Sequence, residues 1–161
     1  GGRAMNGGSD IVGLLRGMPF IGELDDETLS AIASTASLVS AADGDVFYLE
    51  DDDSYDVYFV VSGVVAVWLE LPNYERYSEL LTMRSGSLFG ALSFLDGARR
   101  DMRTTARERS LVLRFHGPLL KAVSVSNPAA GRAVYQLLGT AAARNARDIS
   151  IEMRNLLAER A

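Results

Sequence analysis

The sequence predicts an α+β domain built on an antiparallel β-roll of the jelly-roll type, that is, a double-stranded β-helix. Two observations predict this fold. Residues 38–115 consist of short β-branched and aromatic runs separated by Gly, Asp, Asn and Pro turns, as in sandwiches and barrels. The flanking residues 10–36 and 116–161 instead carry the apolar spacing of helices, and a further short apolar segment inside the β region has helical character. We therefore expect one domain over residues 10–126, with its β-roll at 38–115, followed by a long helix at 127–161.

The composition excludes several classes of protein. The 161 residues are long enough for one core, and 48% are hydrophobic while 23% are charged, as in an ordinary globular protein. The absence of cysteine excludes disulfides, thiolate zinc sites and cysteine nucleophiles. A single histidine, His116, makes a histidine metal centre or a cupin-like enzyme improbable, because that enzyme needs a cluster of His and Glu ligands. We expect no enzymatic activity, no metal, no cofactor and a cytoplasmic location. The Gly-rich residues 1–9 are expected to be disordered and are typical of a vector-derived remnant.

The net charge of −5 hides an asymmetry between the two parts of the chain. Residues 1–98 hold 4 Arg and 16 Asp or Glu, whereas residues 99–161 hold 11 Arg and 1 Lys against 5 Asp or Glu. A basic second half is compatible with nucleic-acid binding. The alternative is a solvated arginine-rich helix beside one anion site. We favour the alternative and expect no nucleic-acid partner, because no helix-turn-helix or basic aromatic strand accompanies the arginines.

The N-terminal part predicts two helices. Residues 10–16 place Ile11, Leu14 and Leu15 on one face of a short amphipathic helix. Asp25 is a suitable N-cap for a second helix from Asp26 to about residue 36, with acidic residues in its first turn.

The β region divides into strands at its turn residues. The run Val57–Val61 is the most β-branched and aromatic, which indicates a central strand, and we expect Val60, Val65 and Val67 in the core. Residues 72–75 are predicted to form a hairpin loop. The acidic run 50–54 is interpreted as a turn rather than a calcium loop, because it lacks the spacing, glycine and terminal glutamate of an EF-hand. The expected strands cover residues 46–49, 57–61, 64–71, 77–83, 102–107 and 111–115.

The segment 86–106 carries the clearest functional pattern. Gly90 opens a short apolar helix, Ala91–Leu95, which Asp96 and Gly97 end. A glycine at a helix start lets a ligand approach the backbone, and the free N–H groups there favour an anion. Arg100 then supplies a side chain suited to bidentate phosphate binding. These features together predict a small phosphate cradle set into the β structure.

This segment resembles the phosphate-binding cassette of cyclic nucleotide-binding domains. That family's pattern is Phe-Gly-Glu, an apolar run, an arginine, a small residue and an alanine, and a strand that ends in alanine. Phe89, Gly90, Arg100 and Ala106 match it in type and spacing. Residues 57–63 are also similar to the family's Leu-Tyr-x-Ile-x-x-Gly segment, and Asp51 stands at a turn that the family usually gives to glycine.

The resemblance implies a regulatory ligand site and indicates which residues would form it. The backbone N–H groups of the cassette helix and Arg100 would bind the cyclic phosphate of cyclic AMP or cyclic GMP, and the strand after the cassette would face the base. Two positions depart from the pattern, because Ala91 replaces the ribose-binding glutamate and Asp101 replaces the small residue. We therefore expect weak or no binding of either nucleotide. The expected ligand-binding residues are Phe89, Gly90, Ala91, Leu92, Arg100, Asp101, Thr104 and Thr105.

The pattern of the C-terminal helix indicates how the domain would dimerise or signal. Asn127 and Pro128 form a helix start, and apolar or small residues follow with near-heptad spacing that Asn145 interrupts. The helix either dimerises or packs on the β-roll and continues as a connector, and both possibilities stay open. In the family this helix signals to an effector. The alternative function is a degenerate domain used for dimerisation or docking.

The parent protein is expected to be larger than this module. Leu113–Phe115 and Arg144–Ile149 are similar to domains at the C-terminal end of sulfate-permease-type transporters and of some bacterial glutaminases. Ser93–Asp96 and Ser110–Arg114 are also similar to segments of patatin-like esterases. Any membrane association would come through such a parent.

Overall fold

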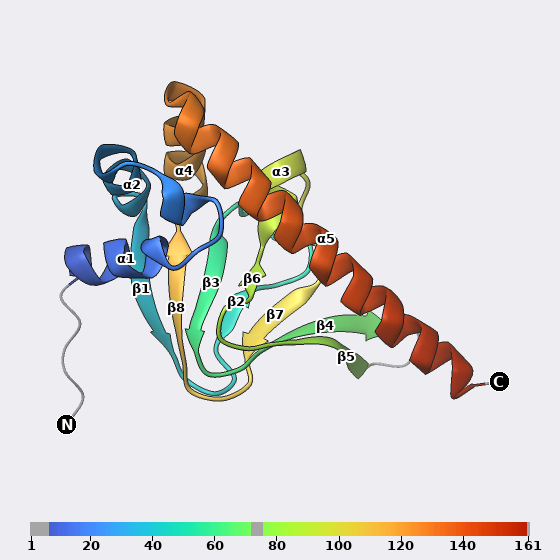
Figure 1. The fold of residues 1–161 in the computed structure, drawn as a ribbon. Helices are drawn as coiled ribbons and strands as arrows, with labels where there is room; N and C mark the ends of the chain where they lie inside the picture. The colour runs from blue at the N-terminus through green and yellow to red at the C-terminus, as the bar shows by residue number, and fades with distance from the viewer. Residues whose placement is uncertain (1–6, 72–75, 161) are drawn as a thin grey trace.

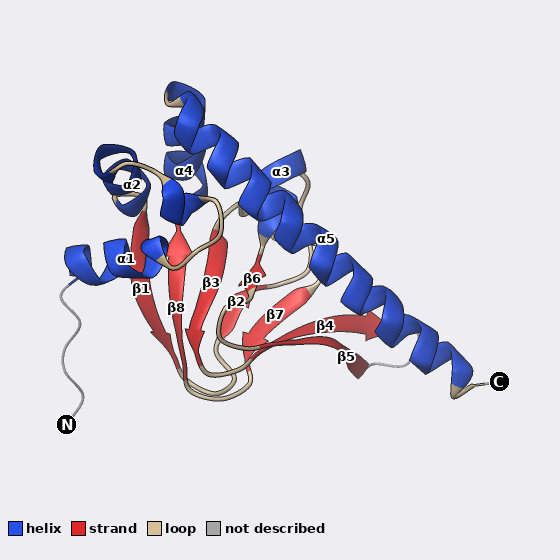
Figure 2. Cartoon of the chain, viewed as in Figure 1, coloured by secondary structure: helices blue, strands red, loops and turns tan. Residues whose placement is uncertain are grey.

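The computed structural model describes residues 7–71 and 76–160. The expected hairpin loop at 72–75 and residues 1–6 lie outside this part. The chain folds as two antiparallel four-stranded sheets with helices gathered on one side (Figures 1 and 2). The first sheet has the order β1-β8-β3-β6 and the second β2-β7-β4-β5. The strands are β1 (Ala36–Ala41), β2 (Val46–Tyr48), β3 (Val57–Ser62), β4 (Val65–Leu71), β5 (Arg76–Met83), β6 (Leu88–Phe89), β7 (Arg103–Ala106) and β8 (Ser110–Phe115).

The α+β fold class and the β-roll are confirmed. Strand β3 lies inside its sheet between β8 and β6, so the prediction of a central strand is confirmed. Val60 and Val65 are fully buried, and Val67 is also buried, because alternate residues of facing strands point between the two sheets. Met83 and Val112 complete this inner core with the aromatic residues described below.

A second core lies between the first sheet and the helices. It joins Leu15, Leu29, Leu113 and Leu138, which are all almost fully buried. The helices that contribute are α1 (Gly7–Arg16), η1 (Ile21–Glu23), α2 (Asp26–Ala33), α3 (Ala91–Asp96), α4 (Gly117–Ser126) and α5 (Pro128–Ala158).

Two helix boundaries differ from the sequence prediction. Helix α1 begins at Gly7, so residues 7–9 are helical and the expectation of disorder is wrong for them. Helix α2 ends at Ala33 rather than near residue 36, because residues 36–41 pair with β8 as strand β1. The predicted cap is confirmed, since the Asp25 carboxylate accepts a hydrogen bond from the Thr28 N–H at 2.8 Å.

Local turn predictions hold where the structure describes them. Asp51 has a φ of 68°, which confirms that this turn needs a left-handed residue. In residues 7–71 and 76–160 no group of three or more His, Cys, Asp or Glu side chains is placed to hold a metal ion. None of the helices in these ranges combines the length and apolar character that crossing a membrane requires.

Helix α5 runs obliquely across the domain, from α4 past α3 to the far ends of β4 and β5 (Figure 1). Its 31 residues span about 46 Å. Asn127 caps it, because its side-chain oxygen accepts from the Ala130 N–H at 3.1 Å. Val134 and Leu138 are buried in the helical core, so the first half of the expected heptad seam packs on this domain instead of facing a second copy. Exposed apolar side chains occur in the second half, at Ile151, Met153 and Leu157.

Candidate functional site

The turn between β6 and α3 is fixed by Gly90. Its φ of 84° is left-handed, and a Cβ at this position would lie 2.7 Å from the Asp56 carbonyl oxygen. Both facts require glycine, because a side chain would be strained and would collide with backbone. Gly97, with a φ of 74°, ends α3 as predicted. The sequence therefore forms the short cassette helix for local reasons that are independent of any ligand.

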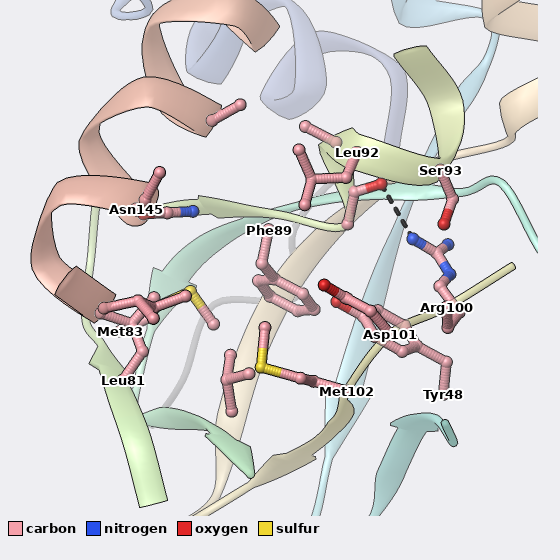
Figure 3. Close-up of a pocket in the computed structure, with 16 residues that line it drawn as sticks. Tyr48, Leu81, Met83, Phe89, Leu92, Ser93, Arg100, Asp101, Met102 and Asn145 are labelled. Carbon is pink, nitrogen blue, oxygen red and sulfur yellow. Dashed lines mark hydrogen bonds between the residues drawn. The ribbon is translucent and has the colours of Figure 1, made fainter. Parts of the chain in front are cut away.

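Arg100 lies behind this turn and is 4% exposed. Its Nη1 donates to the Gly90 carbonyl oxygen at 2.8 Å, and its Nη2 donates to the Asp56 carbonyl oxygen at 2.7 Å. Its Nε donates to Ser54 Oγ at 3.0 Å, and its guanidinium carbon lies 4.1 Å from the centre of the Tyr48 ring. Figure 3 shows the bond to Gly90. Every guanidinium nitrogen of Arg100 thus already has a protein acceptor.

The arginine therefore performs a structural task in this conformation. It connects the start of α3 to the segment before β3, and its charge is compensated by two carbonyl groups, a hydroxyl and an aromatic face. A guanidinium has five N–H donors, so two remain for a ligand. A bound phosphate would share Arg100 with the backbone rather than have it alone.

Asp101 places a carboxylate beside the same turn. Its side chain is exposed and points toward the Phe89 side of the cavity (Figure 3). It forms no ion pair or hydrogen bond with any side chain that the structure describes. The neighbouring arginines are directed elsewhere, because Arg99 donates to the Asp51 carbonyl oxygen at 3.0 Å and Arg103 lies over the Tyr77 ring at 4.1 Å.

These residues surround a cavity of about 290 Å³. Most of its wall is apolar, and among the described residues that line it Arg100 is the only cation and Asp101 the only acid. The strands contribute one wall, α3 a second and α5 the cover. The lining residues are Tyr48, Val67, Leu81, Met83, Phe89, Gly90, Ala91, Leu92, Ser93, Arg100, Asp101, Met102, Ala142, Asn145, Ala146 and Ile149.

Helix α5 is attached to the cavity rim through one polar side chain. Asn145 Nδ2 donates to the Leu88 carbonyl oxygen at 2.8 Å. The rings of Tyr135 and Phe94 add a contact between α5 and α3, with centroids 5.9 Å apart. Asn145 is a site residue that the sequence pattern did not predict. The signal that could have identified it is its position as a polar residue inside the apolar stripe of this helix.

An aromatic cluster supports the floor of the cavity. Phe89 stacks on Tyr58 with centroids 4.8 Å apart, and Phe47 meets both rings edge-on. Tyr48 completes the cluster beneath Arg100. Burial raises the pKa of the Tyr48 and Tyr58 hydroxyls above the ordinary value. Both tyrosines are therefore neutral near pH 7, and neither was predicted from the sequence as a site residue.

The structure brings together six of the eight sequence-predicted site residues. Thr104 and Thr105 are not among the residues that line the cavity. Thr104 is fully buried, and Thr105 Oγ1 accepts from Trp68 Nε1 at 2.9 Å. Their predicted contact with a base therefore has no counterpart in this cavity. The other six, which do line it, are Phe89, Gly90, Ala91, Leu92, Arg100 and Asp101.

Comparison with known proteins agrees with this architecture. The family model for the cyclic nucleotide-binding domain matches residues 38–124, more than half of the chain. Among curated proteins no sequence matches.

Several solved structures share the fold. A cyclic nucleotide-binding domain from Methylobacillus flagellatus aligns with a TM-score of 0.77 at 18% identity, over 97% of this chain and 88% of that one. The catabolite activator protein of Thermus thermophilus aligns with a TM-score of 0.65 at 23% identity, over 86% of this chain and 62% of that one. The regulatory domain of Toxoplasma gondii PKA, solved with cAMP, gives 0.67 at 14% identity, over 81% of this chain and 49% of that one.

The β-roll, the glycine-led cassette with its arginine, the long covering helix and the match of the family model over residues 38–124 lead to one conclusion: this chain belongs to the cyclic nucleotide-binding domain family.

Proposed function

We propose that this domain is a regulatory ligand-sensing module, that the cavity beneath α5 is its sensing site, and that cyclic AMP and cyclic GMP bind there weakly or not at all. One observation carries the proposal. Arg100 is buried with all three guanidinium nitrogens on protein acceptors, while the carboxylate of Asp101, which pairs with none of the described side chains, lines the same cavity. A cyclic phosphate would therefore meet a shared cation and an opposing charge.

The departures at Ala91 and Asp101 should lower the binding free energy of a cyclic nucleotide by several kcal/mol. Ala91 replaces the ribose-binding glutamate that the family pattern has, which removes a hydrogen bond to a charged group worth about 1.5–3 kcal/mol. Two like charges about 4 Å apart cost from about 1 kcal/mol in water to about 4 kcal/mol at an effective dielectric near 20. The exposure of Asp101 favours the lower part of that range. A loss of about 4 kcal/mol changes a micromolar site into a millimolar one.

Signalling would pass through α5. This helix covers the cavity with Ala142, Asn145, Ala146 and Ile149, and its amide contact to Leu88 lies at the cavity rim. A ligand that enters must contact this helix, so occupancy and helix position are coupled. We propose that the partner is an effector domain of a larger protein. A transporter parent, a cytoplasmic location and the absence of enzymatic activity remain predictions.

A specific observation also favours the alternative function, a docking or dimerisation module. Ile151 is 55% exposed and Leu157 is 66% exposed on the second half of α5. Such side chains on a helix that extends beyond the core are suited to a partner helix. A docking or dimerisation function does not require a ligand, so a ligand-binding experiment distinguishes it from a sensing function.

Calorimetric titration with cyclic AMP and cyclic GMP tests the proposal. We expect dissociation constants near millimolar or no measurable heat. Hydrogen exchange of α5 is measured in parallel, because a sensing role requires that ligand occupancy changes its protection. A dissociation constant at or below about micromolar for either nucleotide would refute the weak-binding proposal.

A further inference from the structure

We infer that the cavity beneath α5 accepts a small apolar molecule that carries a protonated amine, and that the ammonium group binds the Asp101 carboxylate. This inference rests on the proposed function only in taking this cavity as the sensing site. It concerns the chemical class of the ligand, which differs here from the cyclic nucleotides that give the family its name.

The walls select for an apolar body. Side chains from β4, β5 and α5 present aliphatic or thioether groups to the cavity, and Leu92, which is 51% exposed, adds another from α3. Apolar walls with a few polar groups are usual for small-molecule sites. A volume of about 290 Å³ is at the small end of such sites, which favours one ring with a short chain. The apolar lining residues include Val67, Leu81, Met83, Met102, Ala142 and Ile149.

The charges at the cavity differ in how well the protein compensates them. The positive charge of Arg100 is directed at two carbonyl oxygens, a hydroxyl oxygen and the Tyr48 ring. No described hydrogen-bond donor or cation contacts the Asp101 carboxylate in this way. Asp101 is therefore the charged group of the cavity that lacks a described partner, and an ammonium group of a ligand would supply one.

The exposed position of Asp101 also keeps the desolvation cost of a cationic ligand low. Its side chain is exposed, so an ammonium group that binds it would keep part of its hydration while the apolar body enters the cavity. A fully buried ion pair would lose this advantage, because desolvation would offset the attraction. We expect a charge-assisted hydrogen bond of this kind to improve binding at least about fivefold over a neutral analogue.

Three ligands of similar size and different charge test the inference. Phenethylamine is a cation, phenethyl alcohol is neutral and hydrocinnamate is an anion at pH 7. Each is titrated into the protein by NMR, with the shifts of α3 and α5 amides as the readout. We expect phenethylamine to bind tightest and hydrocinnamate weakest. Equal affinities, a preference for hydrocinnamate, or no binding of any of the three at millimolar concentration would overturn the inference.

Two variants locate the effect. Asp101→Asn keeps the shape of the side chain and removes its charge, so phenethylamine should lose its advantage over phenethyl alcohol. Glu108→Gln makes the same chemical change at an exposed acid in the turn between β7 and β8, outside the cavity lining, and should preserve the order. An unchanged order in Asp101→Asn would also overturn the assignment.

A fourth titration, with cyclic AMP, separates this inference from the proposed function. Micromolar binding of cyclic AMP beside an amine preference would refute only the weak nucleotide affinity. Weak binding of cyclic AMP without an amine preference would refute only the ligand class.

Discussion

Changing two residues should give this domain the nucleotide affinity that its sequence lacks. Ala91→Glu restores the acidic side chain of the family pattern in the first turn of α3, where the helix dipole also favours a negative charge. Asp101→Ser removes the carboxylate beside Arg100 and leaves a small hydroxyl. Neither residue belongs to the inner core between the sheets, but Ala91 is 5% exposed and packs in the helical core, so the thermal melt of each variant is measured beside its binding.

The expected gain in binding free energy has two contributions, one from the added glutamate and one from the removal of Asp101. The glutamate adds about 1.5–3 kcal/mol if it reaches the ribose hydroxyl. Removal of Asp101 adds about 1 kcal/mol or more, up to about 4 kcal/mol, because the like-charge cost depends on the local dielectric. The two sites are close together, so the terms need not add fully. If both contributions act fully, we expect cyclic AMP to bind the double variant tighter by about 2.5–7 kcal/mol, a factor of about seventy or more.

Calorimetry on the wild type, both single variants and the double variant forms a complete cycle. Arg100→Lys in the double variant is the control, because it keeps the charge and removes the planar fork that suits a phosphate. We expect this control to lose most of the gain. A double variant that melts like the wild type and still binds no tighter would refute the reasoning that Ala91 and Asp101 weaken the site. The structural cause would then be the engagement of Arg100 by the backbone.

Three further results are expected. Val60→Asp should abolish cooperative thermal unfolding, because an uncompensated charge in a fully buried position costs several kcal/mol; a normal melt by circular dichroism would contradict the core assignment. Gly90→Ala should lower the free energy of unfolding in urea by about 1–3 kcal/mol, because of its left-handed φ and the short contact with Asp56, and an unchanged midpoint would argue against this turn. Burial raises the pKa of Tyr48, so its neutral form stabilises the fold below pH 10 and this contribution disappears as the pH rises through the folded-state pKa; Tyr48→Phe should weaken the alkaline loss in melts across that range.

The oligomeric state needs a different variant from the one that the heptad pattern suggests. Leu138 belongs to the apolar stripe but is only 2% exposed in the helical core, so its replacement would test folding instead of association. Leu157 is 66% exposed, so its replacement would test association through α5 without disturbing the core.

The sequence by itself determined the features that depend on local chemistry. Alternating β-branched residues specify β3 and its buried Val60, because a period of two places every second side chain on one face. Asp25 and Asn127 specify helix starts, since an N-cap needs only the residues of the following turn. The spacing from Gly90 to Arg100 specifies the cassette, because a left-handed turn and a short helix are set within a few residues.

The tertiary structure alone decided what the cassette residues are free to do. Two of the three acceptors that occupy Arg100 come from positions 54 and 56, more than forty residues away, and no local pattern predicts that they surround it. The same holds for Asn145, which is 57 residues from Leu88 and becomes part of the site only because α5 crosses the β-roll. Hydrogen-bond partners across such separations depend on how sheets and helices pack. A sequence therefore shows which chemical groups a site contains, whereas the packing decides which of them are left for a ligand.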